Sequence, residues 1–192
     1  AFIATAERTM LMDAGWEFFL MGCHLERAIM ACSALRPILG KLDDLAAGQG
    51  TPELVARARS GDAPELSALL RMLGSQDAYR RLYQSASQPG LVTALFLVQE
   101  NVPRSLMYNL QRIRRSVRVV ATSTPQEQDE AVVAAVDELL RFLRELPIQD
   151  FFRARKTQES SADSARSSLG ELLAHLLDRL FDLHPLLSDH YF

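Results

Sequence analysis

Residues 5–39 limit the fold of this chain more than any other feature, because good helix formers there carry apolar side chains on every side of a helical wheel. A helix that is apolar all round has to be covered by other elements, so we expect it at the centre of the protein. Pro37 predicts an end or a kink in this helix. Its apolar residues include Met10, Leu11, Trp16, Phe18, Phe19, Leu20, Met21, Leu25, Ile29 and Met30.

The rest of the chain predicts further helices separated by short breaks. A long helix is predicted after Pro103 and Ser105, because apolar residues then recur every three or four positions. Residues 91–99 are apolar enough for a buried strand, but the chain offers no partner strand, so we predict a helix. Residues 155–170 are polar and serine-rich, which predicts a mobile loop. The other predicted helices cover residues 51–58, 66–73, 75–85, 132–143 and 172–187, and the apolar stripe of the long helix comprises Leu106, Leu110, Ile113, Val117 and Val120.

The sequence contains no strand pair, internal repeat or coiled-coil heptad, so the predicted fold class is all-α. We expect an irregular helix bundle with two or three long helices and several short ones. The length of 192 residues suits a single domain over residues 1–192 and is enough to bury a core without metal or disulfide support. The chain starts without methionine and ends at Phe192, so we expect it to be excised from a larger parent chain.

Composition limits the classes of function. The net charge of −3, from 21 basic and 24 acidic residues, argues against a general nucleic-acid or membrane-surface binder and leaves local patches open. Cys23 and Cys32 lie too far apart in one helix to form a disulfide, and no secretory signal opens the chain, so we predict a cytoplasmic location. Charge-free stretches such as residues 91–99 are shorter than the ~20 apolar residues of a membrane span. We therefore expect no membrane and no nucleic acid among the partners.

Charged and polar side chains interrupt the apolar first helix. Burying an ionised group costs several kcal/mol unless a partner compensates, so these residues need an explanation. Neighbouring positions on a helix point about 100° apart, so Glu26 and Arg27 each need a separate partner. Arg104, Asn101 and Glu100 are the candidates. A buried ion network that fixes helix register is the favoured interpretation, and a ligand-facing polar site is the alternative. The interrupting residues are Glu17, His24, Glu26 and Arg27.

Motifs for metal or catalytic chemistry are absent from the sequence. His24 and Glu26 have the His-x-Glu spacing of zinc deaminases, but the Pro-Cys-x-x-Cys partner is missing. No histidine follows a glutamate by three residues, as di-metal bundle sites require. Gly48 and Gly50 are an isolated pair rather than a phosphate-binding loop. We predict no metal site, no catalytic residue and no cofactor, and we expect His24 to be a core or partly exposed histidine.

The most basic stretch of the chain falls on the long predicted helix. Arg104, Tyr108, Gln111 and Arg115 lie within about 60° of one another on a helical wheel, so they form one stripe. With Arg118, this stripe predicts a surface that grips a phosphate, a carboxylate or an acidic partner. A solvated helix face is the alternative interpretation. The arginines of the stretch are Arg104, Arg112, Arg114, Arg115 and Arg118.

Four segments occur in an order that is similar to one known family. They are WEFFLMGCHLERA at residues 16–28, then residues 69–83, residues 95–108, and the closing LSDHYF at residues 187–192. Together they resemble the alpha-E domain family, which is all-helical and carries a Glu-Arg pair. The residues that match this family's pattern are Glu26, Arg27, Pro103, Arg104 and Ser105, and the matched polar residues with Asn101 make up the expected polar network.

The chain also departs from the family pattern. The family usually carries arginine at Cys23, often an acidic residue at Leu20, and commonly aspartate at Gln99. Three charged positions are thus neutral here, which favours a scaffold role. The resemblance implies an association with circularly permuted ATP-grasp ligases, either fused or encoded nearby, and with transglutaminase-like peptidases. ATP-grasp enzymes form amides through an acyl phosphate, and this chain lacks nucleotide-binding strands, so a partner domain is expected to bind the ATP.

Two main hypotheses of function follow. The first is a non-catalytic helical domain of an ATP-grasp amide or peptide ligase system, docking the ligase or its peptide substrate through the stripe of Arg104, Tyr108, Arg115 and Arg118. The second is an enzyme or small-ligand site in a polar cleft around Glu26, Arg27 and Arg104. A third, weaker hypothesis is a homo-oligomer whose apolar first helix is covered by a second copy.

Overall fold

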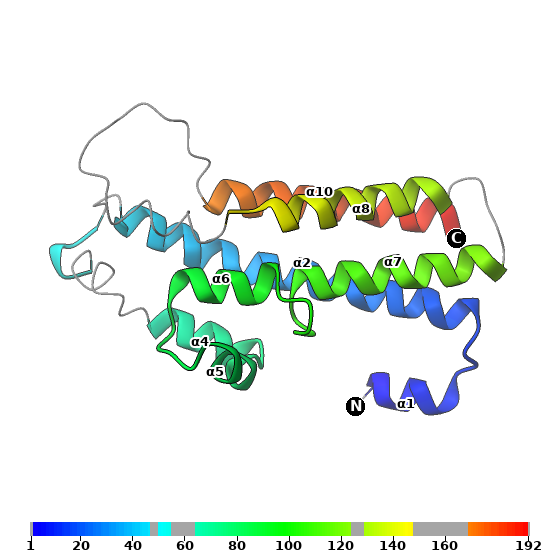
Figure 1. Ribbon diagram of the computed structural model, residues 1–192, viewed down its shortest axis with the longest axis horizontal. Helices are drawn as coiled ribbons and strands as arrows, with labels where there is room; N and C mark the ends of the chain where they lie inside the picture. The colour runs from blue at the N-terminus through cyan, green and yellow to red at the C-terminus, as the bar shows by residue number, and fades with distance from the viewer. Residues whose placement is uncertain (1, 47–49, 55–63, 124–128, 148–168, 192) are drawn as a thin grey trace.

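The computed structural model describes residues 2–46, 50–54, 64–123, 129–147 and 169–191 (Figure 1). Within these ranges every labelled element is a helix, so the predicted all-α class is confirmed. Four helices are long, with 17 residues or more each. The helices are α1 (Phe2–Thr9), α2 (Ala14–Ala46), α4 (Pro64–Met72), α5 (Gln76–Tyr83), α6 (Pro89–Leu97), α7 (Leu106–Ser123), α8 (Asp129–Glu145) and α10 (Leu169–Tyr191).

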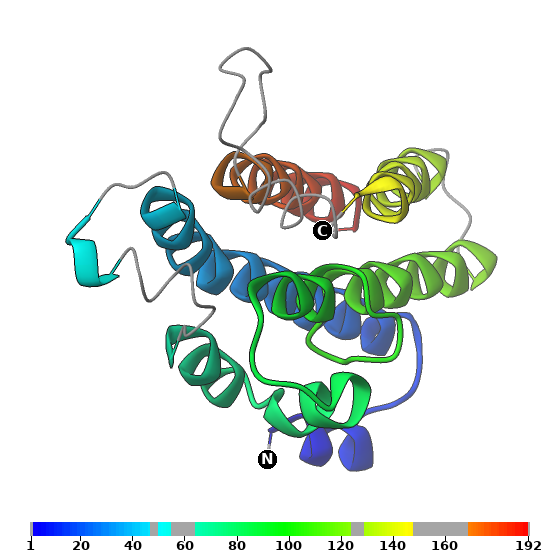
Figure 2. The same cartoon turned by 60° about the vertical axis from the view of Figure 1, so that its left-hand side comes forward.

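The helices stack in layers around α2. α2 packs against α7 and α10, and α8 closes the bundle by packing on both α7 and α10. Figures 1 and 2 show α8 and α10 together above α2 and α7, with α4 and α5 below. The short helices α4, α5 and α6 contact one another and the side of the bundle, whereas α1 lies apart near the N-terminal end of α2. The prediction of a central first helix is thus confirmed for α2.

The apolar run at residues 5–39 differs from the prediction at both ends. It is broken between α1 and α2, where the Asp13 carboxylate accepts a hydrogen bond from the backbone N–H of Trp16 (3.2 Å) and caps the start of α2. Of the two outcomes predicted at Pro37, an end of the helix is wrong, because α2 continues to Ala46. Proline in a helix costs about 3 kcal/mol, but Leu35 and Leu39 are buried on either side of it. Each buried leucine contributes about 2 kcal/mol, so packing offsets the cost.

Several predicted boundaries agree with the structure. α6 confirms a helix rather than a strand near residues 91–99. The Ser105 hydroxyl accepts a hydrogen bond from the backbone N–H of Tyr108 (3.0 Å), so Ser105 caps α7 as expected. Thr51 makes a similar contact with the N–H of Leu54 (3.4 Å). Of the predicted loop at residues 155–170, positions 155–168 lie outside the described residues, and so do residues 55–58; positions 169 and 170 begin α10.

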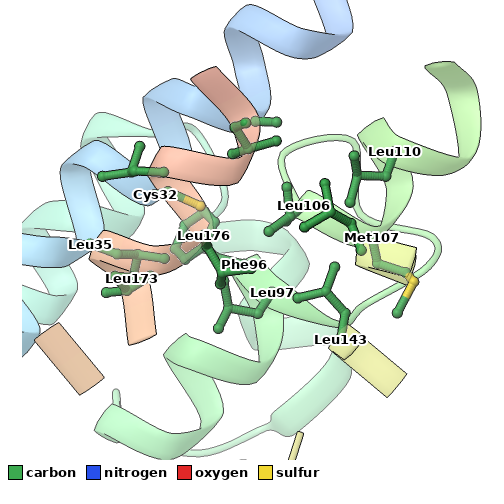
Figure 3. Packing of buried hydrophobic residues seen from close by; sticks show 14 of the residues in the cluster. Cys32, Leu35, Phe96, Leu97, Leu106, Met107, Leu110, Leu143, Leu173 and Leu176 are labelled. Carbon is green, nitrogen blue, oxygen red and sulfur yellow. The ribbon is translucent and has the colours of Figure 1, made fainter. Parts of the chain in front are cut away.

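One core joins the four long helices to α6. Figure 3 shows side chains of α2, α6, α7, α8 and α10 packing against one another. Leu106 and Leu110 of α7 are fully buried, and so is Leu143 of α8. Burial also raises the pKa of the Cys32 thiol to about 12, so this cysteine is an inert part of the core. The core therefore holds α7 from two sides and leaves its remaining face to solvent.

One helix of the described chain has the length and apolar character of a membrane span. The stretch is Ala14–Lys41 of α2. The sequence analysis compared only charge-free stretches with the length of a membrane span, so it missed this helix, which contains a few charged residues. A core helix covered by neighbours has the same composition, and α2 packs against α7 and α10 here.

Candidate functional site

The exposed side of α7 is strongly basic. The helix carries four arginines, which are Arg112, Arg114, Arg115 and Arg118, and no acidic residue. Its opposite side is the predicted apolar stripe, and all five of those residues are buried. The stripe thus fixes the rotation of α7 and points the arginines away from the core. This positive face belongs to a chain whose net charge is −3.

A groove of about 460 Å³ runs along this face between α7 and α8. Most of its lining comes from positions one helical turn apart on α7, and one arginine comes from the last turns of α8. We call this feature the arginine groove. It is lined by Gln111, Arg114, Arg115, Arg118, Val119, Thr122 and Arg144.

The four arginines of the groove are not equivalent. Arg114 is held by Asp137 of α8: its Nη2 donates a hydrogen bond to one carboxylate oxygen (3.1 Å), and its Nε lies 2.7 Å from the other as an ion-pair contact. Arg115, Arg118 and Arg144 are exposed and form no ion pair with any residue that the structure describes. Arg114 therefore forms part of the wall, and the other three guanidinium groups are open to an external anion.

A second hollow shows the contrast. It has a volume of about 220 Å³ and lies between α8 and α10. Its single arginine, Arg179, pairs with Glu138 at 2.6 Å, and Asp182 lies in the same lining. The arginine of this hollow is paired within the protein, whereas three of the four arginines in the arginine groove form no ion pair with a described residue.

The seam between α2 and α7 contains a buried polar joint. His24 is 4% exposed, and its Nδ1 lies 2.8 Å from the side-chain oxygen of Asn109, which is fully buried. The Asn109 amide nitrogen donates to the carbonyl oxygens of Pro103 (3.1 Å) and Ser105 (2.7 Å). Both amide hydrogens are therefore used, so the oxygen accepts and His24 Nδ1 carries the proton. We call these two side chains and two carbonyls the His24–Asn109 joint.

Burial lowers the pKa of His24, and the positive charges of Arg27 and Arg112 lower it further. The hydrogen bond that His24 donates to the Asn109 oxygen raises the pKa, but it does not reverse the lowering. Tyr108 closes the seam, with its ring 6.1 Å from the His24 ring and 5.7 Å below the Arg112 guanidinium carbon. His24 is thus a neutral core histidine, within the range that the sequence predicted.

The structure places the Glu-Arg pair differently from the expected buried network. Glu26 is exposed and Arg27 is half-buried. Asn101 and Glu100 are exposed, and Arg104 is half-buried in the turn before α7. Among the described residues, neither Glu26 nor Arg27 forms an ion pair. The favoured interpretation of a buried network around this pair is therefore wrong, because α2 turns Glu26 to solvent and the His24–Asn109 joint takes the buried position.

The predicted binding stripe is brought together only in part. Arg115 and Arg118 line the arginine groove, but Tyr108 leans toward α2 and Arg104 precedes the helix. The sequence prediction missed Asn109 and Arg144. Asn109 lies between apolar core positions, which is a signal that was available, whereas the position of Arg144 depends on how α8 packs against α7.

Metal and thiol chemistry find little support in the described part of the chain. No group of three or more His, Cys, Asp or Glu residues is placed there to hold a metal ion. Cys23 is a free, half-buried thiol, and burial raises its pKa although the charge of Arg27 acts in the opposite direction.

Comparison with known proteins decides the family. The model of the Alpha-E family, described as a predicted alpha-helical domain with a conserved ER motif, matches residues 1–192. The chain belongs to the Alpha-E family. The sequence resemblance places the Glu-Arg pair of this Alpha-E domain at Glu26 and Arg27.

Relatives of this Alpha-E domain occur in mycobacteria. Uncharacterized proteins of Mycobacterium bovis and of two Mycobacterium tuberculosis strains are 28% identical over 183 residues, which is 95% of this chain. The chain spans only 18% of the length of these relatives. No solved structure matches the chain.

Proposed function

We propose that this Alpha-E domain is a non-catalytic helical part of an ATP-grasp amide or peptide ligase system, and that it docks the ligase or its peptide substrate through the basic face of α7. The observation that carries the proposal is the arginine groove, in which three guanidinium groups form no ion pair with any described residue. Ligases that activate carboxylates act on anionic substrates, and guanidinium groups bind carboxylates through paired, charge-assisted hydrogen bonds.

The length of the relatives supports the idea of a module. This domain accounts for 18% of each mycobacterial relative, so those chains have room for other domains. ATP activation requires a nucleotide site, and the described part of this chain consists of helices without a glycine-rich phosphate loop. In the proposed system ATP is bound by the ligase, fused or separate, and the cytoplasm is the expected location.

The test is reconstitution of the domain with an ATP-grasp ligase fused to it or encoded beside it. ADP release and amide formation are followed with the wild-type domain and with the Arg115→Ala/Arg118→Ala variant. The proposal predicts that the wild-type domain stimulates the ligase and the variant does not. The matched control is Arg80→Ala/Arg81→Ala, which removes two exposed arginines from α5, outside the groove. Equal stimulation by all three proteins contradicts the proposal.

A second candidate function is a small-ligand or catalytic site around Glu26, Arg27 and Arg104. The exposure of Glu26 and the lack of an ion pair to Arg27 within the described residues favour it. Neither hollow contains these residues, which makes it the weaker candidate. It predicts that Glu26→Gln and Arg27→Gln abolish activity of the ligase system without a change in Tm, while the groove variant stays active.

A further inference from the structure

We infer that the arginine groove takes an acidic peptide segment, whose carboxylates pair with Arg115, Arg118 and Arg144. The inference rests on the proposed function for its site and names the class of ligand. It adds that recognition uses three of the four arginines, because Arg114 is already committed to Asp137.

Charge is the first argument. Three guanidinium groups face one groove, and no acidic residue of α7 offsets them. Like charges that lie close together repel each other. A bound polyanion would relieve this electrostatic repulsion between the arginines. Each guanidinium offers paired N–H donors that match a carboxylate. The groove is therefore complementary to a ligand with several carboxylates.

Shape is the second argument. From Gln111 to Thr122 the groove follows α7 for about 16 Å, at 1.5 Å rise per residue. An extended peptide advances about 3.3 Å per residue, so this length accommodates about five residues. The Gln111 amide can bond a peptide backbone, and exposed Val119 offers an apolar contact. The Thr122 hydroxyl donates to the Val119 carbonyl (2.7 Å), so its oxygen is still able to accept a peptide N–H.

The residues that line the groove also favour a peptide over a compact phosphate group as the ligand. Sites for a compact phosphate group commonly use convergent backbone N–H groups at the N-terminus of a helix. The groove lies along the side of α7 and near its C-terminal end, and Arg144 comes from the last turn of α8. Its donors are long side chains spread along the groove rather than convergent amides, which suits carboxylates distributed over a peptide.

The test is fluorescence anisotropy with a labelled peptide of about six residues rich in Glu and Asp, against the same peptide with Gln and Asn instead. We expect the acidic peptide to bind the wild-type chain and the neutral peptide not to bind it. The affinity for the acidic peptide should fall as salt rises from about 50 to 200 mM. Arg115→Ala/Arg118→Ala should weaken binding about tenfold or more, since two charge-assisted contacts are lost. Arg80→Ala/Arg81→Ala, matched in charge, should leave it unchanged.

Three outcomes overturn the inference. The first is that the neutral peptide binds as tightly as the acidic one. The second is that both double variants lose the same amount of affinity for the acidic peptide. The third is that inorganic phosphate, at the same concentration as the peptide, displaces it. The last outcome would assign the groove to a small anion. The ligase assay is independent of this one. If the peptide binds but the domain has no effect on the ligase, the proposed function is refuted and the inference stands. If the domain stimulates the ligase but does not bind the peptide, the inference is refuted and the proposed function stands.

Discussion

The two edges of α7 use polar residues in opposite ways. On the edge facing α2, Asn109 is fully buried, and its side chain is satisfied by His24 and by the carbonyls of Pro103 and Ser105. On the edge facing α8, Arg115 and Arg118 have no ion pair among the described residues. Buried polar groups without partners are costly, so the first edge had to be completed within the protein. The second edge has no such partners among the described residues, as the proposed binding surface requires.

Arg114 and Arg115 show the same contrast at neighbouring positions. The first packs beside α8 and is fixed by Asp137, and the second points outward without an ion pair to any described residue. A shift of one position around a helix is enough to separate an arginine paired within the protein from one that the proposal assigns to ligand binding. The number of arginines therefore does not define the proposed binding surface. What defines it is which of these arginines lack an ion pair within the described residues.

The largest effect should come from the buried stripe of α7. Leu110→Ala removes a fully buried side chain, and we expect the free energy of unfolding to fall by about 2–5 kcal/mol. Chemical denaturation followed by circular dichroism measures it. A loss below about 0.5 kcal/mol, the range of ordinary surface substitutions, would mean that this face of α7 is not the packed one.

The second-largest effect on stability should come from the His24–Asn109 joint. Asn109→Ala leaves His24 and two backbone carbonyls without their partner, so we expect a loss of about 1–3 kcal/mol. The exposed Asn101 provides the control, since Asn101→Ala should change stability by less than about 0.5 kcal/mol. Equal effects of the two substitutions would remove the distinction between the two edges of α7.

The pH dependence of stability should report the joint as well. The pKa of folded His24 lies below its ordinary value of 6.5, so below pH 6.5 the unfolded chain takes up a proton first. The stability from neutral His24 is complete above pH 6.5 and is lost as pH falls toward the folded pKa. Denaturation midpoints at about pH 7.5 and 5.5 should therefore differ less in His24→Gln than in the wild type. His184→Gln, at an exposed histidine, is the control and should behave as the wild type.

The smallest effect on stability should come from the groove itself. Arg115→Ala/Arg118→Ala removes two exposed charges that repel their neighbours, so the free energy of unfolding should change by less than about 0.5 kcal/mol. Thermal unfolding of this variant beside Arg80→Ala/Arg81→Ala checks the expectation. A loss above about 1 kcal/mol would show that these arginines support the fold and would weaken the binding interpretation.

The sequence predicted the features that depend on local periodicity. The apolar stripe of α7 and its cap at Ser105 are properties of neighbouring residues, and both agree with the structure. The continuation of α2 through Pro37 was not predictable in this way, because it depends on leucines that other helices cover. Tertiary packing overrides the local cost of a proline.

The candidate site was predicted less completely than the fold. Periodicity located Arg115 and Arg118 on one face, but Arg144 joins them only because α8 packs antiparallel beside α7. Glu26 was expected to be buried because the helix around it is apolar, yet α2 leaves this position exposed. Which polar residues of an apolar helix are buried depends on where its neighbours end, and a single sequence does not contain that information.

The most direct test of the difference between the two edges is nuclear magnetic resonance of the ¹⁵N-labelled chain titrated with the acidic peptide. Shift changes in the arginine Nε–H signals of Arg115, Arg118 and Arg144, with the His24 and Asn109 signals unmoved, are the predicted result. Changes that cluster instead around Arg27, or that are absent at saturating peptide, would contradict the assignment of the groove as the binding surface.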